Sequence, residues 1–79
     1  MTRFILVIND PGEWGYNCKD VETFPTREDA CQKMTELYRE RAKKRGIDPS
    51  VNDTRQHGIT ADYAYIFGDY YLDIFEKHV

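Results

Sequence analysis

The side chains that could carry out chemistry in this chain are two histidines, two cysteines and fourteen carboxylates. His57 lies in a polar stretch and His78 lies beside the last residue, and neither has a Cys or Ser neighbour at the spacing of a nucleophile and its base. The Cys and His residues also lack the paired spacing of a zinc site. We therefore expect no enzyme, with no catalytic residue, no metal ligand and no cofactor site, and we expect both histidines at the surface.

The loop Gly12-Glu13-Trp14-Gly15 holds the one tryptophan of the chain. Its sequence indicates a turn and lacks the pattern of a phosphate-binding loop. Trp14 either folds under the domain as a lid on the core or stays exposed as an anchor for a partner. The second alternative places Trp14 among the candidate partner-binding residues.

Length and composition predict a single folded domain over residues 1–79. Hydrophobic residues make up 41% of the chain and eleven residues are aromatic, whereas disordered chains are poor in both. The N-terminal apolar run, Phe4 to Ile8, is far shorter than a signal-peptide core or a membrane span. Two cysteines, Cys18 and Cys31, are fewer than a disulfide-stapled domain of this size carries, so we expect a reducing cytoplasm and no membrane partner.

Two strands are expected before the helix. Residues 3–8 (RFILVI) are apolar at both odd and even positions, which predicts a central strand covered on both faces. Asn9-Asp10-Pro11-Gly12 ends this strand with four turn-forming residues. Residues 16–23 (YNCKDVET) alternate weakly and predict a second strand near a sheet edge.

The helix has signals at both ends and is predicted over residues 27–45. Thr26 is a natural N-cap with Asp29 in the capping-box position, and Gly46 stands where a left-handed C-terminal cap belongs. The apolar residues that recur at helical spacing should face the sheet. They are Ala30, Met34, Leu37, Tyr38 and Ala42. Cys31 flanks this stripe, and we interpret it as a small buried thiol, with a reactive thiol as the alternative.

A hairpin is expected after a polar connector, residues 48–57. Its strands, 58–67 and 70–77, are joined by a two-residue turn at Gly68-Asp69. The face expected to meet the helix then carries Tyr63, Tyr65, Phe67, Tyr70, Leu72 and Ile74. The predicted fold class is α+β: a four-stranded antiparallel sheet with one long helix packed on one face, in the order β-β-α-β-β.

Charge is segregated along the chain, whose net charge is −3. Residues 26–46 hold seven basic and four acidic side chains, hence +3, and residues 58–79 hold four acidic and one basic, hence −3. The basic half of the helix could contact phosphates, or it could be a solvated helix end with the cations that its dipole favours. These cations are Arg39, Arg41, Lys43, Lys44 and Arg45. The acidic hairpin, with four of the six tyrosines, could engage a basic protein surface or could be an ordinary polar sheet face.

Two segments, FPTREDACQKMTELY and AYIFGDYYLDIFE, resemble in overall character the small proteins encoded by bacteriophages and mobile elements, including anti-CRISPR proteins. That resemblance implies a non-enzymatic α+β protein in the cytoplasm of a bacterial host cell. It also implies stoichiometric binding to a host protein or ribonucleoprotein complex, such as a nuclease or its nucleic-acid-binding surface. The acidic hairpin would then stand in for the phosphates of DNA.

The leading hypothesis is therefore a protein-binding inhibitor that acts through the acidic, tyrosine-rich sheet surface and the adjoining loops. Its candidate contact residues are Trp14, Asp62, Tyr63, Tyr65, Asp69, Tyr70, Tyr71 and Asp73. The alternative is a small nucleic-acid-binding module that uses the basic half of the helix for phosphates and tyrosines for base stacking. A third hypothesis is a homodimer formed by edge pairing of strands.

Overall fold

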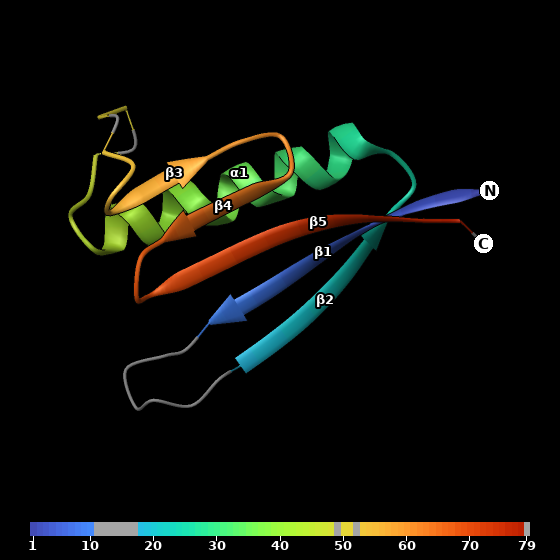
Figure 1. Cartoon of the computed structure of the whole chain (residues 1–79), viewed down its shortest axis with the longest axis horizontal. Coiled ribbons are helices and arrows are strands. Elements are labelled where there is room, and N and C mark those ends of the chain that lie inside the picture. Colours follow the sequence, from blue (N-terminus) through green and yellow to red (C-terminus); the bar gives the residue numbers. More distant parts are fainter. Residues whose placement is uncertain (11–17, 49, 52, 79) are drawn as a thin grey trace.

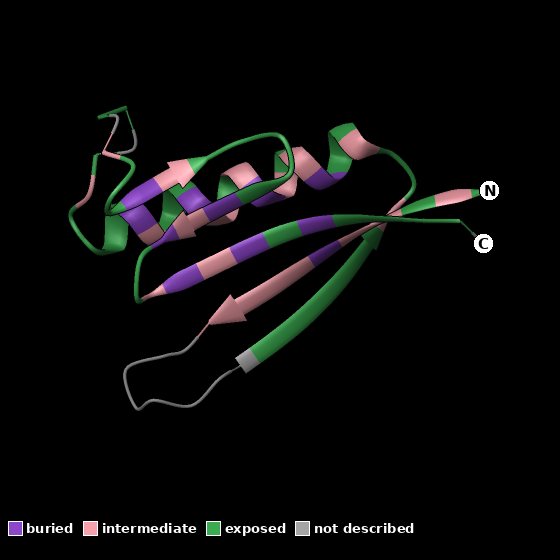
Figure 2. Ribbon diagram, viewed as in Figure 1, coloured by how far each residue is buried: buried purple, intermediate pink, exposed green. Residues whose placement is uncertain are grey.

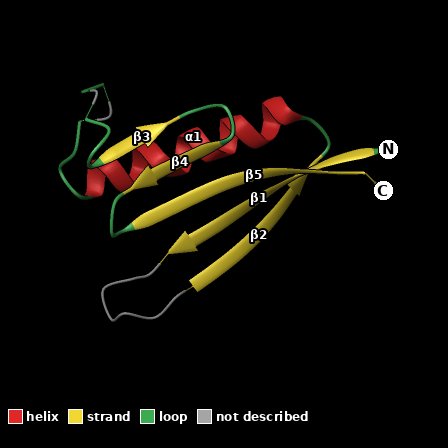
Figure 3. Cartoon of the chain, in the orientation of Figure 1, coloured by secondary structure: helices red, strands yellow, loops and turns green. Residues whose placement is uncertain are grey.

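The computed structural model describes residues 1–10, 18–48, 50–51 and 53–78, so Trp14 lies outside the described residues. The elements are β1 (Thr2–Asp10), β2 (Cys18–Phe24), α1 (Arg27–Lys44), β3 (His57–Ile59), β4 (Tyr63–Ile66) and β5 (Tyr70–His78). The strands form one antiparallel sheet in the order β2-β1-β5-β4-β3, and α1 packs on one face of it (Figures 1 and 3). The α+β class is confirmed, with five strands in place of the four expected.

The helix begins and ends at the predicted signals. The Thr26 hydroxyl accepts a hydrogen bond from the Asp29 amide at 3.2 Å, which satisfies one of the free donors of the first turn. Gly46 adopts a positive φ of 72°, and the amides of Gly46 and Ile47 donate back to carbonyls of the last turn at 3.2 and 2.8 Å. This pair of bonds is a Schellman motif, so the helix proper ends at Lys44, one residue before the predicted end.

The core lies between α1 and the strands β1, β5 and β4 (Figure 2). Its buried residues are Leu6, Ala30, Met34, Tyr38, Ala42, Ala64, Ile66, Tyr70, Leu72 and Ile74. Leu37 and Cys31 are half-buried and pack against this core. The predicted apolar stripe of the helix is therefore confirmed. The Cys31 thiol donates to the Ala61 carbonyl at 3.1 Å.

Two predictions about the first strands have different outcomes. β2 is an edge strand, as expected. β1 lies inside the sheet between β2 and β5, but α1 covers only one of its faces and no other described element covers the second. The expectation of a strand covered on both faces is therefore wrong, because the single helix can cover only one side of the sheet.

The strand expected over residues 58–67 is divided into β3 and β4. The chain reverses at Thr60-Ala61-Asp62, where the Thr60 amide donates to the Tyr63 carbonyl at 2.7 Å. The Thr60 hydroxyl also accepts from the amides of Asp62 and Tyr63, at 3.3 and 3.2 Å. Such side-chain bonds to the local backbone compete with strand pairing, so a polar Thr-Ala-Asp segment forms a turn here.

The turn between β4 and β5 has three residues in place of two. Ile66 pairs with Tyr70, and the Asp69 amide donates to the Ile66 carbonyl at 2.9 Å. Gly68 occupies the third position of this four-residue turn with a φ of 76°, the positive value that a type II turn requires there.

The extra turn residue shifts the register and turns β4 over, because a slip of one residue exchanges the two faces of a strand. Ala64 and Ile66 face the helix, whereas Tyr63 and Tyr65 face away from it. Phe67 lies in the turn with 74% of its surface exposed. The predicted helix-facing set is thus correct for β5 and wrong for β4.

His57 is buried, with 4% of its surface exposed, so the surface position expected for it is wrong. Its Nδ1 shares a 2.8 Å hydrogen bond with the Tyr38 hydroxyl, and its amide donates to the Asp53 carbonyl at 2.9 Å. Buried polar groups need such partners, and Tyr38 lies on the helix, far away in the sequence. His78 is exposed, as expected.

Candidate partner-binding face of the sheet

The strand register places every strand residue on one of two faces, because directly opposed residues point to the same side. We call the face away from α1 the open face, since no described element lies against it. Its residues are Arg3, Ile5, Val7, Asn9, Lys19, Val21, Thr23, Gly58, Tyr63, Tyr65, Tyr71, Asp73, Phe75 and Lys77.

The middle of the open face carries apolar and aromatic side chains around one carboxylate, Asp73. Phe75 lies opposite Ile5, and Val7 lies opposite Val21 on one side and Asp73 on the other. The apolar members are Ile5, Val7, Val21, Tyr63, Tyr65, Tyr71 and Phe75. Phe75 and Val21 expose 55% and 58% of their surface, and Tyr63 exposes 46%. Contiguous apolar surface of this kind marks interaction sites in folded proteins.

The tyrosines of the open face are held in fixed positions. The rings of Tyr63 and Tyr65 stack at 6.1 Å between centroids with an interplanar angle of 27°. The Tyr65 hydroxyl donates to the Thr54 carbonyl at 2.6 Å, and the Tyr71 hydroxyl accepts from the Gly68 amide at 2.7 Å. Side chains that are already fixed lose little conformational entropy when a partner binds.

Charge differs sharply between the two sides of the sheet. The open face holds three cations, Arg3, Lys19 and Lys77, against one carboxylate, Asp73, which gives a net charge of +2. The whole chain has a net charge of −3, so everything outside the open face sums to −5. The acidic residues of the strands that point to the helix side are Asp10, Asp20, Glu22 and Glu76.

The helix neutralises the two acidic residues of the hairpin turns. Arg27 contacts Asp62 at 2.5 Å. Asp69 accepts from Arg41 at 3.3 Å and from Arg45 at 2.9 Å. The acidic hairpin surface that the sequence predicts is therefore divided, and two of its carboxylates are paired within the chain.

Arg41 is the centre of the helix-side cluster. Its Nη2 lies 2.5 Å from Asp10 Oδ2, and its Cζ lies 4.2 Å from the centroid of the Tyr70 ring. The hydrogen bond to Asp10 raises the pKa of Arg41, and burial raises the pKa of Tyr70. Because Arg41 and Arg45 are both engaged by carboxylates, the predicted phosphate-contacting patch of the helix loses two of its five cations.

The structure separates the eight predicted contact residues. Those that share the open face are Tyr63, Tyr65, Tyr71 and Asp73. Asp62 and Asp69 lie in turns and are held by helix arginines, and Tyr70 is buried in the core with 6% exposure. Trp14 is outside the described residues.

Four apolar members of the open face were missed by the sequence analysis: Ile5, Val7, Val21 and Phe75. A signal for them exists in residues 3–8, which are apolar at both odd and even positions. A chain with one predicted helix can cover one sheet face, so such a strand must leave apolar side chains uncovered on the other.

The edge strand β2 bears on the hypothesis of a homodimer. Asp20 and Glu22 both point to the helix side, and the Asp20 carboxylate accepts from the Val21 amide at 2.9 Å. A second copy paired antiparallel along β2, with the open faces continuous, would set these acidic side chains against their own counterparts. Like charges placed opposite each other destabilise a strand pair, so charge opposes this dimer.

The residues that the structure describes form neither a metal site nor a membrane-spanning helix. No three His, Cys, Asp or Glu side chains of these residues gather as a metal site would require. None of the helices in this part of the chain has the length and apolar character needed to cross a membrane.

Comparisons with known proteins give no relative. No protein-family model matches the chain, and neither the curated proteins nor the solved structures searched contain a similar protein. A functional proposal must therefore come from the residues and their geometry.

Proposed function

We propose that this chain is a non-enzymatic protein-binding module that docks its partner on the open face. The observation that carries the proposal is the group of uncovered apolar side chains that surrounds Asp73 on this face of the sheet. An interface core is typically apolar and aromatic, with tyrosine among its commonest residues. Phe75 and Tyr63 on β5 and β4, and Val21 on β2, are the most exposed apolar side chains of this face.

The charge of the open face specifies the chemistry of the partner. Arg3 and Lys77 lie opposite each other at one end of the face, and Lys19 lies near the other end. The complementary partner surface is largely apolar with an acidic border and a hydrogen-bond donor opposite Asp73, because opposite charges across an interface favour association and its specificity.

A narrower form of this proposal is a phage-type inhibitor of a host nucleic-acid-binding or nuclease complex. The pairing of Asp62 and Asp69 with helix arginines argues against imitation of DNA phosphates by the hairpin. A face with a net charge of +2 fits an acidic or apolar patch of such a complex better than its basic nucleic-acid groove.

A capture experiment with face-specific variants tests the proposal. The immobilised wild-type chain is compared with the double variant Val21→Ser, Phe75→Ser and with Val51→Ser. Val51 is 55% exposed, about as exposed as Val21, but lies outside the open face, so it is a matched control. Bacterial lysate is applied with and without nuclease treatment, and each retained protein is purified and measured by calorimetry.

We expect the wild type and Val51→Ser to retain a protein whose capture does not change after nuclease treatment. The affinity of that protein for the double variant should be at least about tenfold lower. Equal binding by the wild type and both variants would remove the open face from consideration. Capture that disappears after nuclease treatment would show that the chain binds nucleic acid and not the protein itself.

A second candidate function, single-stranded nucleic-acid binding, is favoured by one observation: stacked aromatic rings and three cations share the open face. Bases stack on aromatic rings while cations contact the backbone. This differs from the sequence-based alternative, which used the helix. Anisotropy of a labelled oligothymidine over a salt series tests it, because phosphate contacts weaken as salt rises. A salt-sensitive signal lost in Arg3→Gln, Lys77→Gln would support this candidate, and no signal at low salt would dismiss it.

A further inference from the structure

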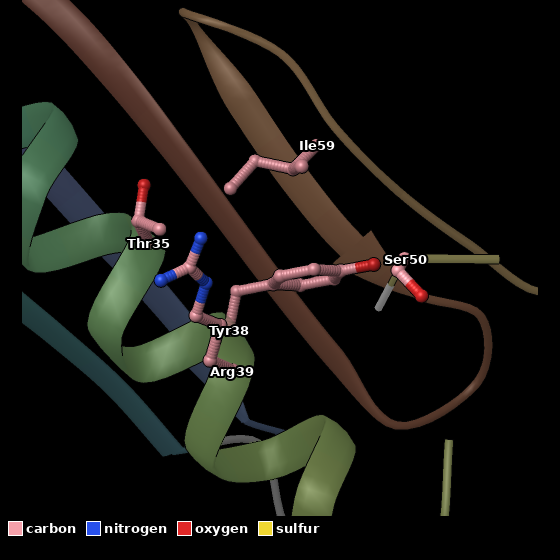
Figure 4. Close-up of a pocket in the computed structure, with 5 residues that line it drawn as sticks. All are labelled: Thr35, Tyr38, Arg39, Ser50 and Ile59. Carbon is pink, nitrogen blue, oxygen red and sulfur yellow. The ribbon is translucent and has the colours of Figure 1, made fainter. Parts of the chain in front are cut away.

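A cavity of about 300 Å³ lies on the helix side of the sheet, between α1, the connector and β3. It is lined by Thr35, Tyr38, Arg39, Ser50 and Ile59 (Figure 4). Ile59 lies opposite Ala64, which faces the helix, so the cavity and the open face are on opposite sides of the sheet. Its volume is at the small end of the range of ligand pockets, about 300–1,000 Å³.

Arg39 gives the cavity a positive charge. Three other arginines of α1 and its C-cap, Arg27, Arg41 and Arg45, each contact a carboxylate. Among the described residues, Arg39 has no carboxylate or other hydrogen-bond acceptor. A guanidinium with free donors binds carboxylate or phosphate oxygens in a forked geometry.

Three hydroxyls line the cavity: that of Tyr38 is bonded to His57 Nδ1, and those of Thr35 and Ser50 can only accept hydrogen bonds from a ligand. The Thr35 hydroxyl donates to the Cys31 carbonyl at 2.8 Å, and the Ser50 hydroxyl donates to the Asp48 carboxylate at 2.7 Å. Because each hydroxyl has a single hydrogen, only the lone pairs of the two oxygens remain. A ligand that satisfies them must present O–H or N–H groups.

The arrangement of these groups orients the ligand. Figure 4 shows the Arg39 guanidinium towards the Thr35 end, while the Tyr38 ring extends along the cavity to Ser50 and Ile59 lies across from them. The Asp48 carboxylate bonded to Ser50 repels an anion from that end. The side chain of Ile59, which is 39% exposed, offers apolar surface between the two polar ends, whereas the Tyr38 ring is buried in the core.

We propose that this cavity binds a small aromatic acid whose acid group pairs with Arg39 and whose far end carries a hydroxyl or amino group directed at Ser50. The ring of the ligand packs against Ile59. This site is independent of the proposed function, because none of its residues belongs to the open face.

The test titrates ¹⁵N-labelled protein with 4-hydroxybenzoate as the probe and follows the amide signals. Saturable shifts are expected at the amides of Thr35, Arg39, Ser50 and Ile59. Arg39→Gln should weaken binding by roughly tenfold, since a charged hydrogen bond is lost. Lys43→Gln, one turn further along the exposed helix surface, is the matched control and should leave the affinity unchanged.

A second probe, 4-hydroxybenzyl alcohol, lacks the acid group and distinguishes pairing with Arg39 from nonspecific binding of the aromatic ring. It should bind wild type more weakly than 4-hydroxybenzoate does, and its affinity should not respond to Arg39→Gln. The proposal is overturned by shifts centred elsewhere, by an acid affinity that Arg39→Gln leaves unchanged, or by no saturable shift up to about 10 mM probe. None of these results would bear on the proposal that a partner docks on the open face.

Discussion

The two faces of the sheet are built from the same strands and are both largely apolar, yet only one of them carries the helix. Leu6 on β1 is fully buried against α1, whereas the next residue, Val7, points to the open face. Hydrophobicity therefore does not decide which face α1 covers. Charge does distinguish the faces, because the strands carry four acidic side chains on the helix side, and three cations against one carboxylate on the open face.

Arginines of α1 pair with acidic residues on the helix side of the sheet. Arg27 meets Asp62 and lies 4.0 Å from Glu76, and Arg41 meets Asp10. Docked on the opposite face, the same arginines would approach Arg3, Lys19 and Lys77 and would be repelled. The distribution of charge over the two faces therefore favours the helix on its observed side and leaves a largely apolar face with cations at its border.

The largest expected difference between the faces lies in their side-chain packing. Leu6→Ala should cost about 2–5 kcal/mol of unfolding free energy, because it leaves a cavity in the core under α1. Val7→Ala should cost about 1 kcal/mol or less, because its neighbours on the open face are partly solvated. Urea unfolding of both variants measures this. Equal costs would mean that something covers the open face of the isolated chain.

A second comparison uses two carboxylates of the final hairpin that lie on opposite sides. Asp69→Asn should cost about 1–3 kcal/mol, because two arginines lose a charged acceptor in a half-buried setting. Asp73→Asn should change stability by no more than about 0.5 kcal/mol, since Asp73 is exposed and has no ion-pair partner among the described residues. Urea unfolding at low and high salt checks both values, and only the Asp69 effect should shrink at high salt. A large cost at Asp73 would contradict the separation of charge by face.

Local signals account for the part of this structure that the sequence predicts well. Thr26 and Gly46 fix the ends of α1 through bonds within a few residues. The hairpin register depends on whether Gly68 occupies a two- or three-residue turn, and Gly-Asp suits both. That one residue decides which tyrosines face outward: Tyr63 and Tyr65, expected on the helix side, lie on the open face. The burial of His57 depends on a hydroxyl from a distant helix residue, which no local pattern reveals.

A third prediction concerns alkaline pH and belongs to the helix side. Burial raises the pKa of Tyr38 and of Tyr70 above the usual value of 10.0. A group whose pKa is higher in the folded state stabilises fully below its unfolded pKa, and that stability is lost as pH rises through the folded pKa. The free energy of unfolding should therefore fall above pH 10, with a slope of at most about 1.4 kcal/mol per pH unit for each tyrosine.

Urea unfolding across this alkaline range provides the measurement, and the variant Tyr70→Phe provides the control. The variant keeps the buried ring but has no phenol to ionise, so its stability should fall less steeply than that of wild type. An unchanged slope in Tyr70→Phe would assign the alkaline loss to other groups.

The smallest expected effect is on the open face, at the contact between β3 and β4. A Cβ added at Gly58 would lie 2.9 Å from the Tyr65 ring and 3.0 Å from its hydroxyl, so the ring must move. Gly58→Ala should therefore break the bond from Tyr65 to Thr54 at a cost of about 1 kcal/mol. Tyr65→Phe removes the same bond without displacing the backbone, so the double variant should cost clearly less than the sum of the two single changes. Additive costs in urea unfolding would show that the bond from Tyr65 to Thr54 does not contribute to stability. The fixed positions assigned to the tyrosines of the open face would then lose their main support.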